Sequence, residues 1–177
     1  MNAVMLDVPE SLLEKRRLMG ADKFDEMWEG VLHMVPPASG HHQRLGTRML
    51  AIFTPLADKR GLVPAYESGL FRSTDDYRVP DQLYARPEHC TDRGFDGDVP
   101  LVVELLSPND ESDAKLGFYG SIGVAEALLI DPLTRAVELF VNQGGQMVLV
   151  QPGPDGLNVA TLGIQLLVVD GPLLRIT

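Results

Sequence analysis

The feature that most constrains this chain is an acidic side chain inside an apolar strand. Residues 99–106 are Val-Pro-Leu-Val-Val-Glu-Leu-Leu, the strongest buried-strand signal in the sequence. Glu104 lies within it, and in a strand its side chain shares a face with Val102 and Leu106. A carboxylate without a partner there would cost several kcal/mol or become protonated. We therefore expect a basic side chain, hydrogen bonds or a divalent cation beside Glu104, unless it lies at a strand end and reaches water.

The remaining pattern predicts one α/β domain, residues 1–177, with a mixed sheet flanked by helices. Helices are expected at residues 9–20, at residues 39–56 with Ser39 as cap and Pro55 kinking or shortening the helix, and at residues 109–122. Strands are expected at residues 27–35 with a turn or bulge at Gly30, 62–72, 78–84, 99–106, 124–130, 136–141 and 146–150. Pro36-Pro37 and Ser107-Pro108 should end strands, residues 87–98 should form a loop, and the apolar runs of residues 157–176 suggest edge strands or a partner surface.

Composition excludes several classes of protein. No apolar run approaches the roughly 18 residues that a membrane span needs, and residues 1–9 do not have the pattern of a secretory signal. Cys90 is the single cysteine, which excludes an internal disulfide framework and a cysteine-based zinc cluster. We therefore expect a soluble, cytoplasmic protein with no membrane contact.

The charge balance disfavours a broad nucleic-acid-binding face. Fifteen basic residues against 25 acidic ones give a net charge of −10, and such a surface repels phosphate groups at long range. Residues 41–93 are close to neutral, so the sequence is compatible with a local basic patch in this segment.

Asp81 and Lys115 are the residues that could complete a site with Glu104. Asp81 follows a proline and lies 23 residues before Glu104, about one strand and a loop away, so both carboxylates converge if their strands are neighbours. Two carboxylates suit Mg²⁺, which leaves its other positions to water and phosphate oxygens. Lys115 lies on the helix after the Glu104 strand and could orient an attacking water or stabilise charge. Alternatively, Asp81 is an ordinary turn residue and Lys115 a surface lysine.

An ordered set of short motifs resembles the Uma2 family of endonucleases, also called DUF820. The resemblance extends from about residue 12 to residue 166. Its motifs are residues 25–31, 36–42, 79–81 and 101–108, followed by Asp113, Lys115, Tyr119, residues 123–124 and residues 130–132.

The resemblance implies a fold and a set of roles. The fold is that of the restriction-endonuclease-like, or PD-(D/E)XK, nucleases, here with additional N- and C-terminal strands, in which two acids and a lysine surround Mg²⁺ or Mn²⁺. Asp81 matches the first acid and Glu104 the second. The usual lysine two positions after the second acid is absent, since Leu106 stands there, and Lys115 matches a substitute on the following helix. His42 and Glu26 match residues that could line the site, although paired histidines at a helix start are otherwise typical of capping or packing.

Three functions follow from these observations. The first is Mg²⁺-dependent hydrolysis of DNA, with Asp81 and Glu104 holding the metal and Lys115 assisting the water; the DNA substrate comes from the resemblance alone. A homodimer that pools local arginines could then strengthen binding, and the candidates are Arg44, Arg48 and Arg86. The second is a non-catalytic binding or assembly module that uses the apolar C-terminal segments. The third is a phosphoesterase for small nucleotides, which would tolerate an acidic surface.

Overall fold

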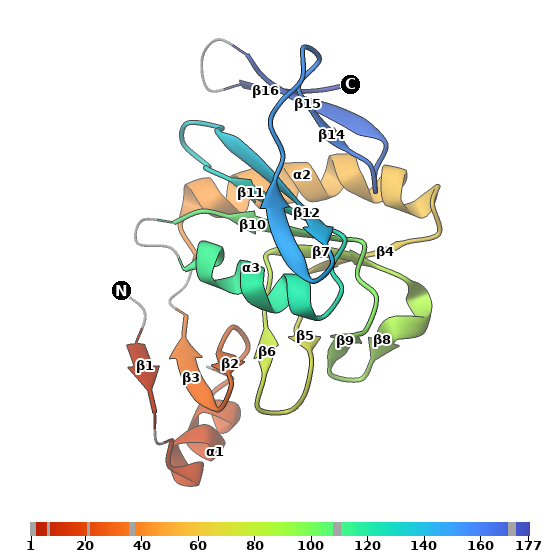
Figure 1. Cartoon of the computed structure of the whole chain (residues 1–177). Helices are drawn as coiled ribbons and strands as arrows, with labels where there is room; N and C mark the ends of the chain where they lie inside the picture. The colour runs from red at the N-terminus through yellow and green to blue at the C-terminus, as the bar shows by residue number, and fades with distance from the viewer. Residues whose placement is uncertain (1–2, 7, 21, 36–37, 108–110, 170–172) are drawn as a thin grey trace.

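The structure is a computed structural model that describes residues 3–6, 8–20, 22–35, 38–107, 111–169 and 173–177 (Figure 1). Three α-helices lie in these ranges: α1 (Glu10–Leu18), α2 (Gly40–Asp58) and α3 (Ser112–Ser121), with a short 3-10 helix at Pro87–His89. Pro36, Pro37, Pro108 and Asn109, where strand ends and a helix start are expected, lie outside the described residues.

The strands form three sheets. The six-stranded sheet has the order β13 (Gln146–Leu149), β12 (Val137–Gln143), β11 (Glu126–Ile130), β10 (Leu101–Leu105), β7 (Gln82–Ala85), β4 (Val63–Tyr66). The seven-stranded sheet has the order β1 (Ala3–Met5), β3 (Val31–Met34), β2 (Glu26–Trp28), β6 (Tyr77–Arg78), β5 (Leu70–Phe71), β9 (Gly94–Asp96), β8 (Cys90–Thr91). The C-terminal sheet consists of β14 (Leu157–Val159), β15 (Ile164–Val169) and β16 (Leu173–Ile176).

The expected buried strand is the centre of the six-stranded sheet. All five residues of β10 are buried, and β10 pairs parallel with β11 and antiparallel with β7, so the sheet is mixed. Alternate side chains of β10 enter two cores: Leu101 and Leu105 pack on the α2 side, and Val102 packs on the α3 side (Figure 1). The predicted α/β class with helices on both faces of a mixed sheet is thereby confirmed.

The long helix α2 is capped as expected but is not shortened by its proline. Ser39 accepts a hydrogen bond from the His42 N–H at 3.3 Å, which satisfies one free donor of the first turn. The helix continues past Pro55 to Asp58, contrary to a shortened helix. Proline has no backbone N–H, so Pro55 cannot donate the helix hydrogen bond to the carbonyl of Ala51. Both residues lie on the exposed face of the helix, where water can replace that bond.

Two segments expected to be single strands are each divided between two sheets. Residues 62–72 form β4 and β5, separated at Glu67, whose φ is +48°. Residues 78–84 contribute to β6 and β7, which are separated by Val79-Pro80-Asp81. The chain thus passes from one sheet to the other at both places, and each bend coincides with a local break in the apolar pattern, at Glu67-Ser68-Gly69 and at Pro80-Asp81. The expected loop at residues 87–98 also contains β8 and β9.

Residues 27–35 are divided as well, by the turn expected at Gly30. Glu29 and Gly30 both have positive φ, 49° and 86°, as a two-residue hairpin turn requires. The segment is therefore a hairpin of β2 and β3.

The C-terminal apolar runs belong largely to the core. Leu157, Val159, Ile164 and Leu166 are buried in the cluster on the α2 side. Glu126 of β11 ties this region to the central sheet, since its two carboxylate oxygens accept the N–H groups of residues 160 and 161 at 2.9 and 2.8 Å. Among the described helices, none is long and apolar enough to cross a lipid bilayer.

Candidate active site

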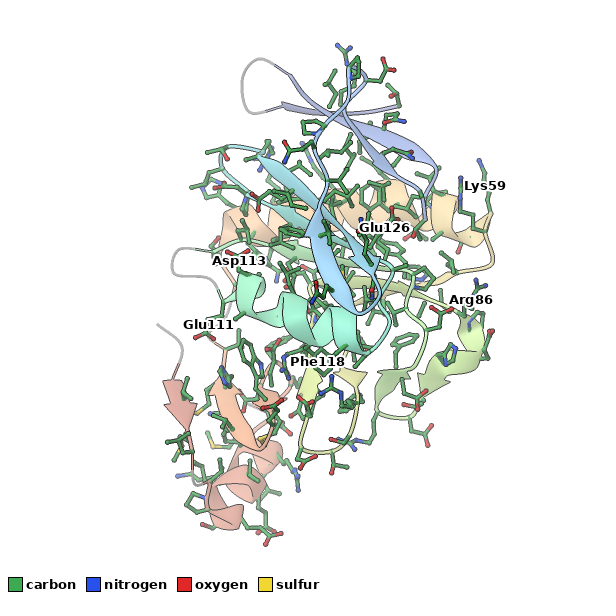
Figure 2. All side chains as sticks on the ribbon, viewed as in Figure 1. Lys59, Arg86, Glu111, Asp113, Phe118 and Glu126 are labelled. Carbon is green, nitrogen blue, oxygen red and sulfur yellow. The ribbon has the colours of Figure 1, made fainter. Side chains whose placement is uncertain are left out.

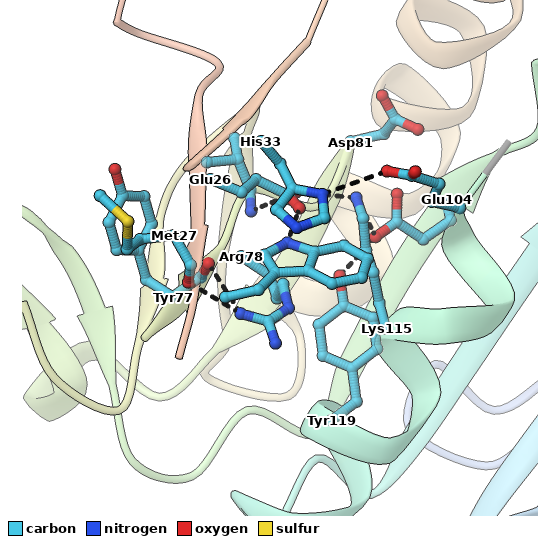
Figure 3. Close-up of polar contacts among 12 residues, drawn as sticks. Glu26, Met27, His33, Tyr77, Arg78, Asp81, Glu104, Lys115 and Tyr119 are labelled. Atoms are coloured by element: carbon cyan, nitrogen blue, oxygen red, sulfur yellow. Dashed lines mark hydrogen bonds and ion pairs between the residues drawn. The ribbon is translucent and has the colours of Figure 1, made fainter. Parts of the chain in front are cut away.

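The candidate site lies at the edge of the six-stranded sheet where β7 begins and β10 ends (Figure 3). In the antiparallel pair Val103 is opposite Gln82, and one further step in this register places Glu104 opposite Asp81. Opposite residues of an antiparallel pair project to the same face, with Cα atoms about 4.5–5.5 Å apart. The two acid-bearing strands are therefore neighbours, as the convergence of the carboxylates requires.

Asp81 is held from two directions. Its Oδ2 accepts the backbone N–H of Leu105 at 2.6 Å, and its Oδ1 lies 3.1 Å from Nε2 of His42. The Ser39 cap at the start of α2 places His42 on the buried face, toward the sheet. The Asp81 side chain is 15% exposed, so it lies between the interior and solvent.

Glu104 is held by two residues one turn apart on α3. Its Oε1 accepts hydrogen bonds from the Tyr119 hydroxyl and from Lys115 Nζ, the latter at 3.1 Å. Lys115 and Tyr119 are four residues apart, so both side chains project from one face of the helix (Figure 3). Within the described residues, Oε2 of Glu104 accepts no hydrogen bond, although the side chain is only 3% exposed.

Glu26 of β2 brings a third carboxylate to the same lysine. Its Oε1 lies 2.8 Å from Lys115 Nζ and accepts the N–H of Val79 at 2.9 Å, while Oε2 accepts the indole N–H of Trp28 at 2.7 Å. Both oxygens of Glu26 are thus engaged, unlike those of Glu104. The ammonium group of Lys115 lies between the two glutamates and joins the hairpin of the second sheet to the central sheet (Figure 3).

A second layer of aromatic and charged groups supports this hairpin. Trp28 stacks on His33 with ring centroids 4.0 Å apart, and the Arg78 guanidinium lies 4.5 Å from the Trp28 ring centroid. Nδ1 of His33 lies 3.3 Å from a carboxylate oxygen of Glu111, just before α3. Asp76 accepts a hydrogen bond from Arg78 at 2.9 Å. The indole that binds Glu26 is thereby fixed on both faces.

Burial and charge shift the proton affinities of the central groups. Burial raises the pKa of Glu104 to about 8; the Lys115 charge opposes this rise, and the carboxylates of Asp81 and Glu26 reinforce it. Burial alone would lower the pKa of Lys115, but Glu104 and Glu26 outweigh it and raise that pKa above its ordinary value. Lys115 is therefore a permanent ammonium group at neutral pH.

All five residues singled out from the sequence lie in this region. Lys115 binds Glu26 and Glu104, and His42 binds Asp81. Tyr119 and Trp28 were not expected as site residues, yet each donates a hydrogen bond to a carboxylate of the site. The four-residue spacing of Lys115 and Tyr119 was the available signal for one of them.

The arrangement fits a hard divalent cation. The carboxyl groups of Glu26 and Glu104 contact the ammonium group of Lys115, and Asp81 lies opposite Glu104, so these acids outnumber the one cation that contacts the two glutamates. Glu104 retains an oxygen without a hydrogen bond, and each Asp81 oxygen has one described partner and a further lone pair. Over the described ranges no three His, Cys, Asp or Glu side chains gather as a metal cluster; the available donors are the pair Asp81 and Glu104. Such a pair is what Mg²⁺ commonly uses.

Comparisons with known proteins point to one family and one fold. The model of the Uma2 family, described as "Putative restriction endonuclease", matches residues 12–169. A solved structure described as a putative nuclease belonging to DUF820 from Anabaena variabilis superposes with a TM-score of 0.60 at 18% identity, covering 78% of this chain and 88% of that one. No curated protein matches. The likeness to the solved structure shows a shared fold, and the family match covers most of the chain.

Proposed function

Because the chain belongs to the Uma2 family, we propose that it is a metal-dependent endonuclease in which Asp81 and Glu104 hold Mg²⁺ or Mn²⁺ and Lys115 assists the attacking water. The observation that carries this proposal is the pairing of β7 with β10, which brings Asp81 opposite Glu104 beside a buried ammonium group. DNA as the substrate is supported by the family's description.

The metal would lower the pKa of a bound water and polarise the phosphoryl group. Lys115, permanently protonated, cannot act as the general base; it orients the nucleophilic water through its N–H groups and stabilises negative charge on the phosphoryl oxygens. Tyr119 fixes one oxygen of Glu104, and the other oxygen would be the one to hold the metal. His42 and the Leu105 N–H fix the orientation of Asp81.

The direct test is cleavage of supercoiled plasmid with Mg²⁺ or Mn²⁺, alongside hydrolysis of a small activated phosphodiester and a mononucleotide ester. An endonuclease converts the plasmid to nicked or linear forms, whereas the small-nucleotide phosphoesterase would hydrolyse only the mononucleotide ester. The alternative of an assembly module relied on apolar C-terminal side chains exposed to a partner, but Val159, Ile164 and Leu166 are packed in the core. The cytoplasmic location and the homodimer stay predictions.

Metal affinity should depend on pH through Glu104. Because burial raises the pKa of this carboxyl to about 8, the metal-free site holds a proton that must leave when the cation binds. The apparent Mg²⁺ affinity is expected to rise up to about tenfold per pH unit from about pH 6 to 8 and to level off above that. Titration calorimetry in two buffers of different ionisation enthalpy measures both the affinity and the proton release. An affinity that is constant over this range, with no proton released, would contradict the assignment.

Glu26 should act by positioning Lys115 and not as a metal ligand, because both of its oxygens already accept hydrogen bonds. The Glu26→Gln variant is expected to lose about 10–100-fold in turnover, while its Mg²⁺ affinity changes by less than about threefold. Glu29→Gln, an exposed acid in the same hairpin, is the matched control and should leave both quantities unchanged. A tenfold or larger loss of Mg²⁺ affinity in Glu26→Gln would make Glu26 a ligand instead.

A further inference from the structure

The long helix α2 begins within a segment without acidic residues in an otherwise acidic chain, and Asp58 at its last position is the one acid of the helix. Residues 30–57 contain no Asp or Glu, although 25 of the 177 residues are acidic. At that average density the 28 residues would hold about four acids. The same segment carries Arg44 and Arg48, so its local charge is positive while the chain as a whole is at −10.

The two arginines form an exposed stripe with His41. The three positions are separated by three and four residues, so they lie on one side of α2, and all three are exposed. In the described residues neither Arg44 nor Arg48 forms an ion pair with a protein carboxylate. The opposite side of the helix is buried against the central sheet. These cations are therefore available to an anion from outside the chain.

The first residue of this stripe, His41, lies in the same turn of α2 as His42, which faces the candidate active site from the buried side of the helix. His42, in the first turn of the same helix, contacts Asp81 at 3.1 Å. At 1.5 Å per residue, Arg48 lies about 9 Å further along the helix axis from His42. Arg44 and Arg48 thus lie one turn apart on the exposed side of α2, and their positions lead away from His42 along the helix axis.

Arg86 and Lys59, two other exposed cations, do not have this arrangement. Arg86, which the sequence grouped with Arg44 and Arg48, pairs with Asp98 at 3.1 Å and follows the end of β7 remote from Asp81. Lys59 follows Asp58 at the far end of α2. Figure 2 shows Arg86 and Lys59 on the side of the molecule away from Glu111 and Asp113, which lie at the end of the sheet that carries the site.

We propose that the outer face of α2 binds the sugar–phosphate backbone of a polynucleotide on one side of the bond to be cleaved, through Arg44 and Arg48. This inference rests on the proposed function for the position of the cleaved bond. Arginine side chains that neutralise phosphates release condensed counterions, and this supplies sequence-independent affinity. Acids close to this helix in the structure include Glu67, which accepts a hydrogen bond from Gln43 of α2 at 2.8 Å, and Asp58 at the far end of the helix, so Arg44 and Arg48 reduce the repulsion of phosphates locally. A mononucleotide ester has no second phosphate to reach these arginines, so the surface favours a polymeric substrate.

The test is a salt titration of binding, carried out in EDTA so that no cleavage occurs. Fluorescence anisotropy follows a labelled duplex of about 30 base pairs, and the matching single strand, from about 50 to 300 mM NaCl. For the variant with Arg44→Gln and Arg48→Gln, the slope of log K against log salt should decrease in magnitude by about 1.4–1.8, and affinity at the lowest salt should fall about tenfold or more.

The matched control removes two exposed cations elsewhere. The variant with Lys59→Gln and Arg86→Gln has the same net charge as the α2 double variant and should keep the wild-type slope. Equal slopes in all three proteins, equal losses in both double variants, or no binding by the wild type would each overturn the inference.

A second readout separates this inference from the proposed function. Hydrolysis of a small activated phosphodiester, which cannot span the stripe, should be unchanged in the α2 double variant and lost in Asp81→Asn. If no metal-dependent hydrolysis occurs but the salt slopes differ as expected, the proposed function fails and the binding surface stands. If metal-dependent hydrolysis occurs and the salt slopes are equal, the binding surface fails and the proposed function stands.

Discussion

Replacing Asp81 with asparagine, or Glu104 with glutamine, is expected to lower metal-dependent hydrolysis of DNA by about a thousandfold or more, equivalent to about 4 kcal/mol of barrier. Each change removes one of the two anionic ligands while keeping the shape of the side chain. Asparagine at position 81 can still accept the Leu105 N–H that Asp81 Oδ2 accepts at 2.6 Å. Glutamine at position 104 can still accept the Tyr119 hydroxyl. The fold should therefore persist while Mg²⁺ affinity and turnover fall together.

Glu126→Gln is the matched control for this experiment. Glu126 is also a buried carboxylate of the central sheet, but it accepts the backbone N–H groups of Ala160 and Thr161 and lies on β11, away from Asp81. The control variant should lose stability and keep the turnover of its folded fraction. Initial rates of plasmid nicking and calorimetric titration with Mg²⁺ measure the two quantities. Activity equal to the wild type in both site variants would remove the nuclease proposal.

The Lys115→Gln variant is expected to be the least stable protein of the series. Lys115 is the one described cation in contact with both Glu26 and Glu104, whose side chains are 1% and 3% exposed. Removing one partner of a buried ion pair leaves an uncompensated charge and typically costs about 3–5 kcal/mol. Urea unfolding at about pH 8 should show a loss of this size in metal-free buffer.

The loss in Lys115→Gln should shrink as the pH falls. The pKa of Glu104 in the folded wild type is about 8, against an ordinary value of 4.5, so between these values the folded state binds more protons than the unfolded state. Stability therefore falls as pH rises through this window. Without the ammonium charge the folded pKa of Glu104 rises further, and the destabilised range extends upward. Near pH 5 Glu104 is protonated in both proteins, so the part of the loss that comes from Glu104 should disappear, while the part that comes from the lost contact with Glu26 remains.

Mg²⁺ should also restore part of the stability of Lys115→Gln at about pH 8. A ligand that binds only the folded state stabilises it by RT ln(1 + [L]/Kd), about 2.7 kcal/mol at a hundredfold excess over Kd. Because the variant lacks the cation that competes for Glu104, its melting temperature should rise more with Mg²⁺ than that of the wild type. A rise equal to that of the Glu104→Gln variant would contradict a metal at this pair.

The sequence could locate Glu104 because it interrupts a local pattern, whereas Asp81 was selected by its spacing from Glu104 and by the family resemblance. Glu104 is a single charge in an apolar run, and its expected basic partner is present as Lys115. The ion pair and the metal ligand, weighed from the sequence as alternatives, are compatible, since Lys115 contacts only one oxygen of Glu104. Local spacing also placed Lys115 near the end of β10, because α3 is the next element of the chain.

The role of Glu26 could not be deduced in this way. Its partners Val79 and Lys115 are 53 and 89 residues away, and nothing near Glu26 in the sequence distinguishes it from the exposed Glu29. The division of residues 62–72 into two strands was not predicted for a related reason. Apolar periodicity records which side chains are buried, whereas the bend at Glu67 is decided by which sheet offers the next backbone partner.

The most direct measurement of the central claim is a crystal structure of the protein grown with Mn²⁺, with anomalous data that locate the metal. We expect one strong anomalous peak bonded to a carboxylate oxygen of both Asp81 and Glu104, with Lys115 remaining on Glu26, and no such peak in Glu104→Gln crystals. Absence of a peak between the two carboxylates at saturating Mn²⁺, or a peak bonded to Glu26 in place of Asp81, would contradict a metal site formed by Asp81 and Glu104.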